Sequence, residues 1–377
     1  MPTARIAGSF MQRMSETGLK LERLRACISE RKLDAYLISL RSNFAWLTGG
    51  GYNHVGMSSD TGAVSLLVTR TRAYALTDNI EMPRVQREEL AGKGFIPVAY
   101  AWYQAVPAAR IRRIVDSSRW CSDDGAFGSH PLSITELHAP LLPQEIERYA
   151  ALGADASRCV TAVCRRARPG MSEYEIAGML AHAFLSIGIL PAVLLIAADE
   201  RIRAFRHPLP TSNKLRRHLM VVVCAQRHGL IVSLTRFVHF GKVPRDLERR
   251  HAAAALVDAA FILSTRSGRT VGDVFRAGVE MYRRTGFAAE WKLHHQGGPT
   301  GYHAREYRAG ADSREKIVPG RAFAWNPSIT GAKSEDTIIT VENPDDAPRI
   351  LTEDPAWPMM AVEYEGDIIR RPDILVR

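Results

Sequence analysis

Cysteine is scarce in this sequence and poorly arranged for pairing. The chain has 377 residues and five cysteines, which are scattered and include no Cys-x-x-Cys pair. A disulfide framework or a structural zinc site needs closely spaced cysteines, so we expect neither. Cys224, in the apolar run VVVCAQ, is a weak candidate nucleophile. A thiol in such a strand usually behaves as a small hydrophobic side chain, which favours a place in the core.

The sequence also has no apolar run long enough to span a bilayer. The best candidate, residues 189–198, is short and is followed at once by Asp199, Glu200 and Arg201. Residues 1–18 contain neither the apolar segment nor the small-residue cleavage site of a secretory signal. We therefore expect a cytoplasmic protein that has no membrane partner.

Basic residues exceed acidic ones, but they form no basic tract. The chain has 50 Lys and Arg against 40 Asp and Glu, a formal net charge of +10. The arginines are spread through helical segments such as RRARPG and LERRHAAAA, and we find no nucleic-acid-binding motif. We interpret the charge as solvated helix faces with some attraction for anionic substrates, and we expect no nucleic-acid partner.

Length and pattern predict two domains. The composition is that of a soluble globular protein, with 46% apolar and 24% charged residues. Residues 1–135 alternate helical and strand patterns and predict a small α/β domain, which ends in the Gly/Ser/Pro-rich stretch 121–133. Residues 136–377 read as helices, strands, helices and strands again. That order predicts an α+β domain with an antiparallel curved sheet.

Periodicity and capping signals place the main elements. Ser172 lies three residues before Glu175, the spacing of a capping box at the start of a helix. The expected helices cover residues 16–32, 143–167, 246–264 and 270–285, together with the one that starts at Ser172. The expected strands cover DAYLISL, AVSLLVT and RAYALTD, then residues 192–198, 219–226 and 230–240, and a last pair that flanks SITGAKSED.

Four ordered stretches carry most of the chemical information. They are RHPLPTSNKL, HGLIVSLTRFVHFGKVP, HHQGGPTGYHARE and VPGRAFAWNPSITGAKSEDTIITVE. In this order and at these distances they resemble the aminopeptidase P and creatinase family, and FAWLTGGGYN resembles part of its small N-terminal domain. The resemblance covers nearly the whole chain. It implies a pita-bread C-terminal domain over residues 136–377 and a creatinase-type domain over residues 1–135.

The resemblance also shows which metal ligands this chain has lost. Peptidases of the family hold two divalent metals with two aspartates, a histidine and two glutamates. The aspartate positions fall on Val222 and Ser233, the first glutamate falls on Asn326, and only the last carboxylate remains, as Glu335. The histidine falls on His294, or on His295 if the alignment slips by one. Since a two-metal centre needs several carboxylates, we expect no metal and no other cofactor.

Creatinase offers a metal-free precedent on this fold. Its glycine-rich segment also carries a histidine eleven residues before an Arg-Glu pair, which matches His294, Arg305 and Glu306. The resemblance makes Arg305 the carboxylate anchor and His207, in RHPLP, the general acid/base. A guanidinium suits a carboxylate because it donates two parallel hydrogen bonds, and an imidazole suits proton transfer near neutral pH. Glu335 would orient a substrate group or the attacking water.

Further candidates follow from the same comparison. His294 is a catalytic candidate with His207 and Glu335. The resemblance also implies a homodimer in which the loop 49–59 of one chain reaches the site of the other. The substrate-binding candidates are therefore Arg305, Glu306, His295, Asn326, Ser233, Tyr52, Asn53 and His54.

Each assignment has a purely structural alternative. His207 would then cap a turn before Pro208, and one of His294 and His295 would pack in the core. Arg305 and Glu306 would form a surface pair, which contributes little stability. Glu335 is equally a buried ion-pair candidate, and Asn326 equally a filler of a vacated site. Arg236 more readily braces the sheet than touches substrate.

The leading hypothesis is a metal-independent hydrolase that cleaves a carbon-nitrogen bond in a small carboxylate-bearing metabolite. Ser233 and Asn326 depart from the carboxylates with which creatinase holds its guanidinium, which favours an amide, lactam or amidine over creatine. One alternative is a metal-dependent Xaa-Pro aminopeptidase or dipeptidase. Another is a non-catalytic protein that binds a peptide or small molecule on the same scaffold.

Overall fold

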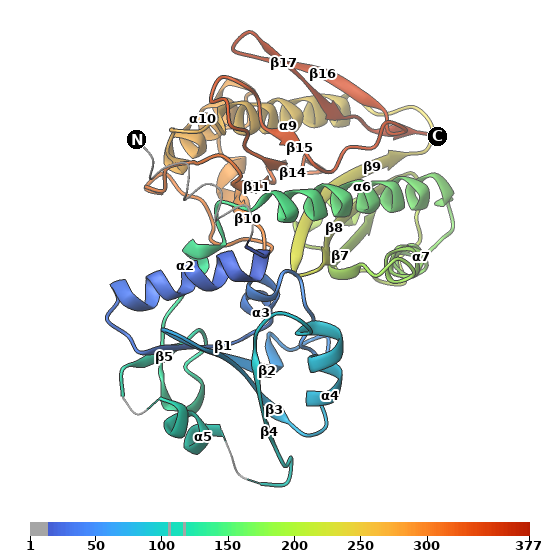
Figure 1. Ribbon diagram of the computed structural model, residues 1–377. Helices are drawn as coiled ribbons and strands as arrows, with labels where there is room; N and C mark the ends of the chain where they lie inside the picture. Colours follow the sequence, from blue (N-terminus) through green and yellow to red (C-terminus); the bar gives the residue numbers. More distant parts are fainter. Residues whose placement is uncertain (1–13, 105–106, 116–117) are drawn as a thin grey trace. The chain divides into compact units, whose positions relative to one another are not determined.

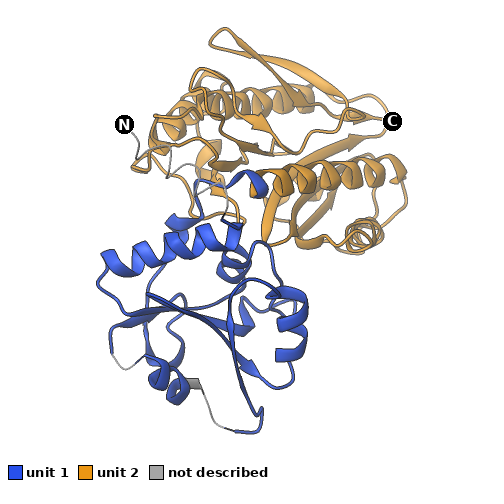
Figure 2. Cartoon of the chain, viewed as in Figure 1, with its two compact units in different colours: residues 1–144 blue, residues 145–377 orange. Residues whose placement is uncertain are grey.

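The computed structural model describes residues 14–104, 107–115 and 118–377. The chain divides into two compact units, residues 1–144 and 145–377 (Figure 2). The boundary predicted between residues 135 and 136 precedes this division. Most of the N-terminal stretch on which the secretion argument depends, residues 1–13, lies outside the described residues. Among the described helices, none has the length and apolar character needed to cross a bilayer.

Unit 1 is built on one six-stranded sheet, with strand order β4-β3-β2-β1-β5-β6 (Figure 1). Strand β1 (Ala35–Leu40) pairs antiparallel with β2 (Thr61–Thr69) and parallel with β5 (Trp120–Ser122). The Gly/Ser/Pro-rich stretch 121–133 thus includes most of β5 and the edge strand β6 of this sheet. The other elements are α2 (Glu16–Glu30), α3 (Arg41–Thr48), β3 (Ala73–Asp78), α4 (Met82–Arg84), η1 (Val85–Glu89), β4 (Ile96–Tyr100), α5 (Pro107–Ile114), η2 (Ala126–Gly128), β6 (His130–Pro131) and η3 (Thr135–His138).

The helices of unit 2 begin and end close to where their sequence signals lie. Helix α7 (Glu173–Leu185) starts with the predicted capping box: the Ser172 hydroxyl accepts the Glu175 N–H at 3.1 Å, and the Glu175 carboxylate accepts the Ser172 N–H at 2.6 Å. The other helices are α6 (Pro143–Arg166), α8 (Glu200–Ala204), α9 (Arg245–Ser264), α10 (Val271–Arg284) and the short η4 (Glu290–Leu293).

Two four-stranded sheets form the β part of unit 2. One has the order β18-β9-β8-β7, in which β7 (Leu190–Ala198), β8 (His218–Arg227) and β9 (Leu230–His239) are antiparallel and β18 (Leu375–Val376) runs parallel to β9. The other has the order β10-β11-β14-β15 and is antiparallel. Its strands are β10 (Gly297–Thr300), β11 (Ala322–Trp325), β14 (Asp336–Ile339) and β15 (Arg349–Ile350), and two hairpins join β12 (Ser328–Ile329) to β13 (Ala332–Lys333) and β16 (Met359–Tyr364) to β17 (Asp367–Pro372).

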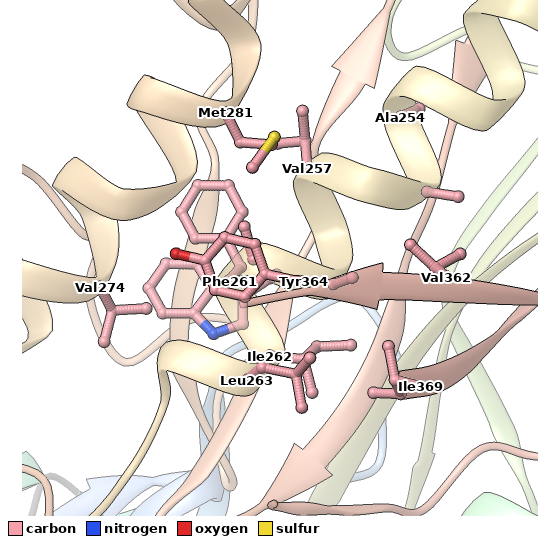
Figure 3. Packing of buried hydrophobic residues seen from close by; sticks show 14 of the residues in the cluster. Ala254, Val257, Phe261, Ile262, Leu263, Val274, Met281, Val362, Tyr364 and Ile369 are labelled. Atoms are coloured by element: carbon pink, nitrogen blue, oxygen red, sulfur yellow. The ribbon is translucent and has the colours of Figure 1, made fainter. Parts of the chain in front are cut away.

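Helices α9 and α10 cover the second sheet and share a large apolar core with it (Figure 3). Phe261 of α9 stacks on Trp325 of β11, with ring centroids 4.7 Å apart. Met281 of α10 and Val362 of β16 belong to the same cluster. This packing holds β11 and its neighbours in place, and their ends carry several residues of the candidate site.

A buried ionic network joins the two sheets next to that site. Arg236 of β9 donates to Asp336 of β14 at 2.9 Å, and Arg371 of β17 donates to the same carboxylate group at 2.7 Å. The Thr235 N–H also donates to the Glu335 carbonyl at 3.1 Å. Arg236 therefore pairs internally, between the two sheets, and is not among the described residues that line the candidate cavity. The network fixes the point at which β9 meets the segment that carries Glu335.

Candidate active site

A cavity of about 460 Å³ in unit 2 is lined by five of the predicted site residues, namely His207, His295, Arg305, Asn326 and Glu335. Strands β7 and β8 provide an apolar wall that includes Val222 and Cys224. The polar part of the lining comes from segments that hold three of the four ordered motifs, RHPLPTSNKL, HHQGGPTGYHARE and VPGRAFAWNPSITGAKSEDTIITVE. Its polar members are His207, His295, Arg305, Asn326, Lys333 and Glu335.

Glu335 is the charged centre of this cavity and is almost fully buried. Its two carboxylate oxygens bind different cations: Lys333 Nζ lies 2.7 Å from Oε2, and Arg305 Nη2 lies 3.0 Å from Oε1. The Thr235 hydroxyl donates to Oε2 at 2.7 Å. Burial by itself would raise the pKa of Glu335, but Lys333 and Arg305 outweigh it and lower the pKa to about 2. The carboxylate is therefore ionised at neutral pH.

Arg305 is held from two sides. Besides its pair with Glu335, Arg305 Nη1 donates to the Ser233 hydroxyl at 3.2 Å. That hydroxyl lies 3.3 Å from the sulfur of Cys224. Burial, and then the charge of Glu335, raise the pKa of the Cys224 thiol, which keeps it protonated and makes it a poor nucleophile.

Three histidines lie side by side at the cavity. His207 Nε2 is 3.0 Å from His294 Nε2, so one ring donates to the other. His294 Nδ1 lies 3.3 Å from the Ser328 hydroxyl, and the Gly297 N–H donates to His295 Nδ1 at 3.3 Å. The centroids of the His294 and His295 rings are 4.6 Å apart. The paired histidines of HHQGGPTG and the histidine of RHPLP thus form one cluster.

The surroundings oppose a positive charge on all three rings. Burial, followed by the charge of Lys333, lowers the pKa of His207 and lowers that of His294 to about 2. Burial, followed by Arg305, lowers the pKa of His295 to about 4. At neutral pH the cluster therefore consists of neutral imidazoles, which is the form that accepts a proton.

The structure separates the two neighbouring histidines of HHQGGPTG. His295 lines the 460 Å³ cavity with His207. His294 is mostly buried behind His207 and, with His295, borders a second cavity of about 410 Å³ beside Phe275 and Trp291. His295 thus lines the cavity that also holds Arg305 and Glu335, and His294 supports His207.

The three remaining predicted residues of unit 2 differ in whether they line the cavity. Asn326 is buried and lines the cavity, and its Oδ1 has no hydrogen-bond partner among the residues that the structure describes. Ser233 is buried behind Arg305. Glu306 accepts the Tyr302 N–H at 3.3 Å and is not among the residues that line the cavity.

Tyr52, Asn53 and His54 belong to unit 1. Asn53 is buried, and its side-chain amide donates to the Val64 carbonyl at 2.9 Å. The Tyr52 and His54 rings meet edge to face, with centroids 5.8 Å apart. Within its own unit, Asn53 therefore holds the loop. The role of the three residues in substrate binding stays a prediction, because it depends on a second chain.

Lys333 is the residue of this site that the sequence analysis missed. It is 5% exposed, and its ammonium group contacts Glu335 directly. The signal was present in SITGAKSED, where Lys333 precedes Glu335 by two residues. In extended backbone that spacing puts both side chains on the same face. The site thus contains a buried cation, Lys333, beside its buried carboxylate.

These side chains do not fit a dinuclear metal centre. Val222 has no ligand atom, Ser233 and Asn326 are uncharged, and both oxygens of Glu335 are engaged by Lys333 and Arg305. The nitrogens of His207, His294 and His295 do lie within 4.8 Å of one another. However, the two neighbouring cations oppose a divalent ion there, and no described residue offers the cavity a free carboxylate to offset its charge.

Comparison with known proteins agrees with this architecture. A model described as "Metallopeptidase family M24" matches residues 147–343, and one described as "Creatinase/Prolidase N-terminal domain" matches residues 20–162. The fold is therefore the α+β pita-bread fold with a creatinase-type N-terminal domain. The chain belongs to metallopeptidase family M24.

Solved structures share the fold at low sequence identity. A dipeptidase from Pyrococcus horikoshii OT3 is 20% identical with a TM-score of 0.75, covering 95% of this chain and 100% of that one. A recombinant prolidase from Thermococcus sibiricus is 15% identical with a TM-score of 0.77, covering 97% and 100%. An Xaa-Pro dipeptidase from Bacillus anthracis is 15% identical with a TM-score of 0.74, covering 96% and 100%. No curated protein matches the chain.

Proposed function

We propose that this protein is a metal-independent hydrolase that cleaves the carbon-nitrogen bond of a small carboxylate-bearing amide, lactam or amidine. The observation that carries the proposal is the placement of a neutral, exposed imidazole, His207, in the same cavity as the cation pair Arg305 and Lys333. His207 supplies proton transfer without a metal. The cation pair selects an anionic substrate.

The charge balance of the cavity supports an anionic ligand. Arg305 and Lys333 are two cations, whereas Glu335 is the one carboxylate among the residues that line the cavity. With neutral imidazoles this leaves one positive charge without an equivalent negative one. A substrate carboxylate offsets that charge by joining Glu335 between the two cations. Guanidinium and ammonium groups both bind carboxylates through charge-assisted hydrogen bonds.

The histidine pair supplies a proton acceptor that is already oriented. His207 removes a proton from water as the water oxygen forms a bond to the substrate carbon. The carbon-nitrogen bond then breaks, and His207 returns the same proton to the leaving nitrogen. An amide or lactam gives an acid and an amine or ammonia, and an amidine gives an amide and an amine or ammonia. His294, hydrogen-bonded to His207 and to Ser328, orients the His207 ring during both transfers. The step needs no oxidant, reductant or metal.

The experiment is a turnover screen on protein treated with EDTA. Small N-acyl amino acids, lactam carboxylates and carboxylated amidines are incubated with the protein, and released amine or ammonia is measured together with product mass. His207→Ala should lower kcat about 100-fold or more and leave substrate binding nearly unchanged. His182→Ala, which alters an exposed histidine of α7, should keep full activity. Full activity of His207→Ala would refute the assignment.

The same screen distinguishes the proposed hydrolysis from two other functions, namely binding without turnover and Xaa-Pro dipeptidase activity. Binding without turnover is supported by the engagement of Arg305 with both Glu335 and Ser233, which resembles a structural clamp. It predicts calorimetric binding of a carboxylate with no product. The activity by which the Xaa-Pro dipeptidase from Bacillus anthracis is named predicts cleavage of an Xaa-Pro dipeptide that requires added Mn²⁺, Co²⁺ or Zn²⁺ and is lost with EDTA.

We also propose a homodimer in which the loop that contains Tyr52 and His54 contributes to the site of the partner. Light scattering coupled to gel filtration should give twice the chain mass of 41.8 kDa. Mixing inactive His207→Ala with inactive Tyr52→Ala/His54→Ala should restore part of the activity, because mixed dimers contain one intact site. A monomer at assay concentration would contradict this arrangement.

A further inference from the structure

His295 faces the same cavity as His207, but the two rings have different hydrogen-bond partners. The two rings lie 5.9 Å apart between centroids, and both line the cavity with Arg305. His207 contacts another imidazole, whereas His295 contacts the backbone: the Gly297 N–H donates to its Nδ1 at 3.3 Å. An imidazole nitrogen that accepts a hydrogen bond carries no proton. The neutral His295 ring therefore carries its proton on Nε2.

The backbone conformation behind this hydrogen bond requires glycine. Gly297 begins β10 with φ +95°, and a Cβ at this position would lie 2.1 Å from the Ala324 carbonyl oxygen of β11. Since L side chains rarely adopt such a φ, and the neighbouring atom is backbone, another residue would displace the N–H. The glycine that follows the paired histidines thus has a specific consequence. It sets which nitrogen of His295 is the donor.

We propose that His295 is a catalytic residue of the hydrolysis, whose Nε2–H donates to the substrate carbonyl oxygen as that oxygen becomes an oxyanion. The inference rests on the proposed function. As the water oxygen bonds to the carbonyl carbon and His207 takes the proton, the carbonyl π electrons move to oxygen. That oxygen then accepts from His295. When the carbon-nitrogen bond breaks, the π bond reforms and the charge disappears.

The same geometry narrows the substrate class. A carbonyl oxygen has lone pairs for a neutral N–H donor, and it gains negative charge in a cavity that contains Arg305 and Lys333. A protonated amidine has no such lone pair, and both cations repel it. The site therefore favours amides and lactams that carry a carboxylate over amidines. This assignment separates three roles among three residues: proton transfer by His207, anion binding by Arg305 and oxyanion stabilisation by His295.

The first test needs no substrate. Protein labelled with ¹⁵N-histidine is measured by two-bond proton-nitrogen correlation NMR, and the His295 signals are assigned by their loss in His295→Phe. We expect an unprotonated Nδ1 and a protonated Nε2 for His295. The opposite tautomer, or a doubly protonated ring at pH 7.5, would overturn the inference. Because this readout is independent of turnover, a failure of the proposed hydrolysis is distinguished from a failure of the His295 assignment.

The second test uses the substrate that the screen identifies. His295→Phe should lower kcat about 100-fold and change KM by less than about threefold, because the hydrogen bond strengthens in the transition state. His295→Gln, which keeps an N–H donor, should have a kcat at least about tenfold higher than that of His295→Phe. Equal loss in both variants, loss confined to KM, or full activity of His295→Phe would overturn the role. Circular dichroism checks that both variants fold.

Discussion

At the scale of single residues, Lys333 determines the charge of the site. Its buried ammonium and the Arg305 guanidinium share the carboxylate of Glu335, so the cavity has more positive than negative charge. The same ammonium lies close enough to His207 to lower the pKa of that ring. One side chain thus influences both the preferred ligand charge and the pH range of the base.

Replacing Lys333 should shift the pH profile of the enzyme. His207 acts as a base only when deprotonated, so kcat/KM is lost as pH falls through its pKa, which burial and Lys333 lower. In Lys333→Met the pKa of His207 rises, and the acid limb should move up by about half a unit to one unit. Binding of the substrate carboxylate should weaken as well.

The matched control for this prediction is Lys242→Met, which removes an exposed lysine that does not line the cavity. Its pH profile should coincide with that of the unchanged protein. An acid limb that stays in place, or moves down, in Lys333→Met would show that the lysine does not act on His207.

At the level of individual residues, sequence motifs located most of the site. His207, His295, Arg305, Asn326 and Glu335 were expected from ordered motifs and line one cavity. Which of the paired histidines faces the cavity was not predictable, because adjacent residues at the start of a strand point to different sides. The spacing in SITGAKSED indicates the contact of Lys333 with Glu335. That both face one cavity with Arg305 depends on contacts between separate segments, which residue-type patterns within one segment do not reveal.

At the scale of elements, local signals predicted most helices and strands. The apolar runs of β8 and β9 and the capping box of α7 are short-range features, and both occur where the sequence indicates. The Gly/Ser/Pro-rich stretch 121–133, which predicts the end of the first domain, includes most of β5 and all of β6 in the sheet of unit 1. Pairing between β1 and β5 is long-range, so composition alone did not show it.

Helix α6 offers a sharp test of element packing. Alanine normally stabilises a helix relative to glycine, by about 1 kcal/mol. At Gly153, however, a Cβ would lie 2.1 Å from the Leu351 carbonyl oxygen, which belongs to the backbone and cannot rotate away. Gly153→Ala should therefore lower the free energy of unfolding by about 1–3 kcal/mol in urea denaturation.

Gly178 of α7 is the matched control, because a Cβ there would meet no atom within 4 Å. Gly178→Ala should raise the free energy of unfolding by about 0.5–1 kcal/mol. Stabilisation of both variants would show that Gly153 of α6 does not lie close to the Leu351 carbonyl.

At the scale of the whole molecule, the family and the charge of the cavity favour opposite expectations about metal binding. The chain belongs to metallopeptidase family M24, yet its cavity contains two cations and one engaged carboxylate. Protein incubated with Mn²⁺, Co²⁺ or Zn²⁺ and desalted should retain well below one ion per chain by elemental mass spectrometry. Two retained ions would contradict the ligand analysis. One ion that is lost in His294→Ala would instead indicate a site made by the three histidines.

Stability should fall as the solution is acidified below neutral pH. The pKa is lowered to about 3 in His218, by burial and then by His239, and to about 2 and about 4 in His294 and His295. The unfolded chain binds protons at these rings near pH 6.5, while the folded chain does not. Each such histidine therefore lowers the free energy of unfolding by roughly 1.4 kcal/mol for each pH unit below about 6.5, until the pH reaches the pKa of that ring in the folded protein.

Urea denaturation at several values between pH 7.5 and pH 5 measures this effect. The free energy of unfolding should decrease steadily over that interval, with the slope reduced in a variant such as His218→Asn. A flat profile, or stability that increases towards pH 5, would mean that the histidines are protonated in the folded protein.

Local sequence signals specify the domain classes, most of the elements, the family and the loss of the metal carboxylates. Each of these depends on local periodicity, capping or ordered motifs, which are properties of contiguous segments. The pairing of Arg305 with Glu335, the contact of His294 with His207 and the exposure of His295 to the cavity are fixed by tertiary packing. These features arise where separate segments meet, and burial there sets both charge and protonation.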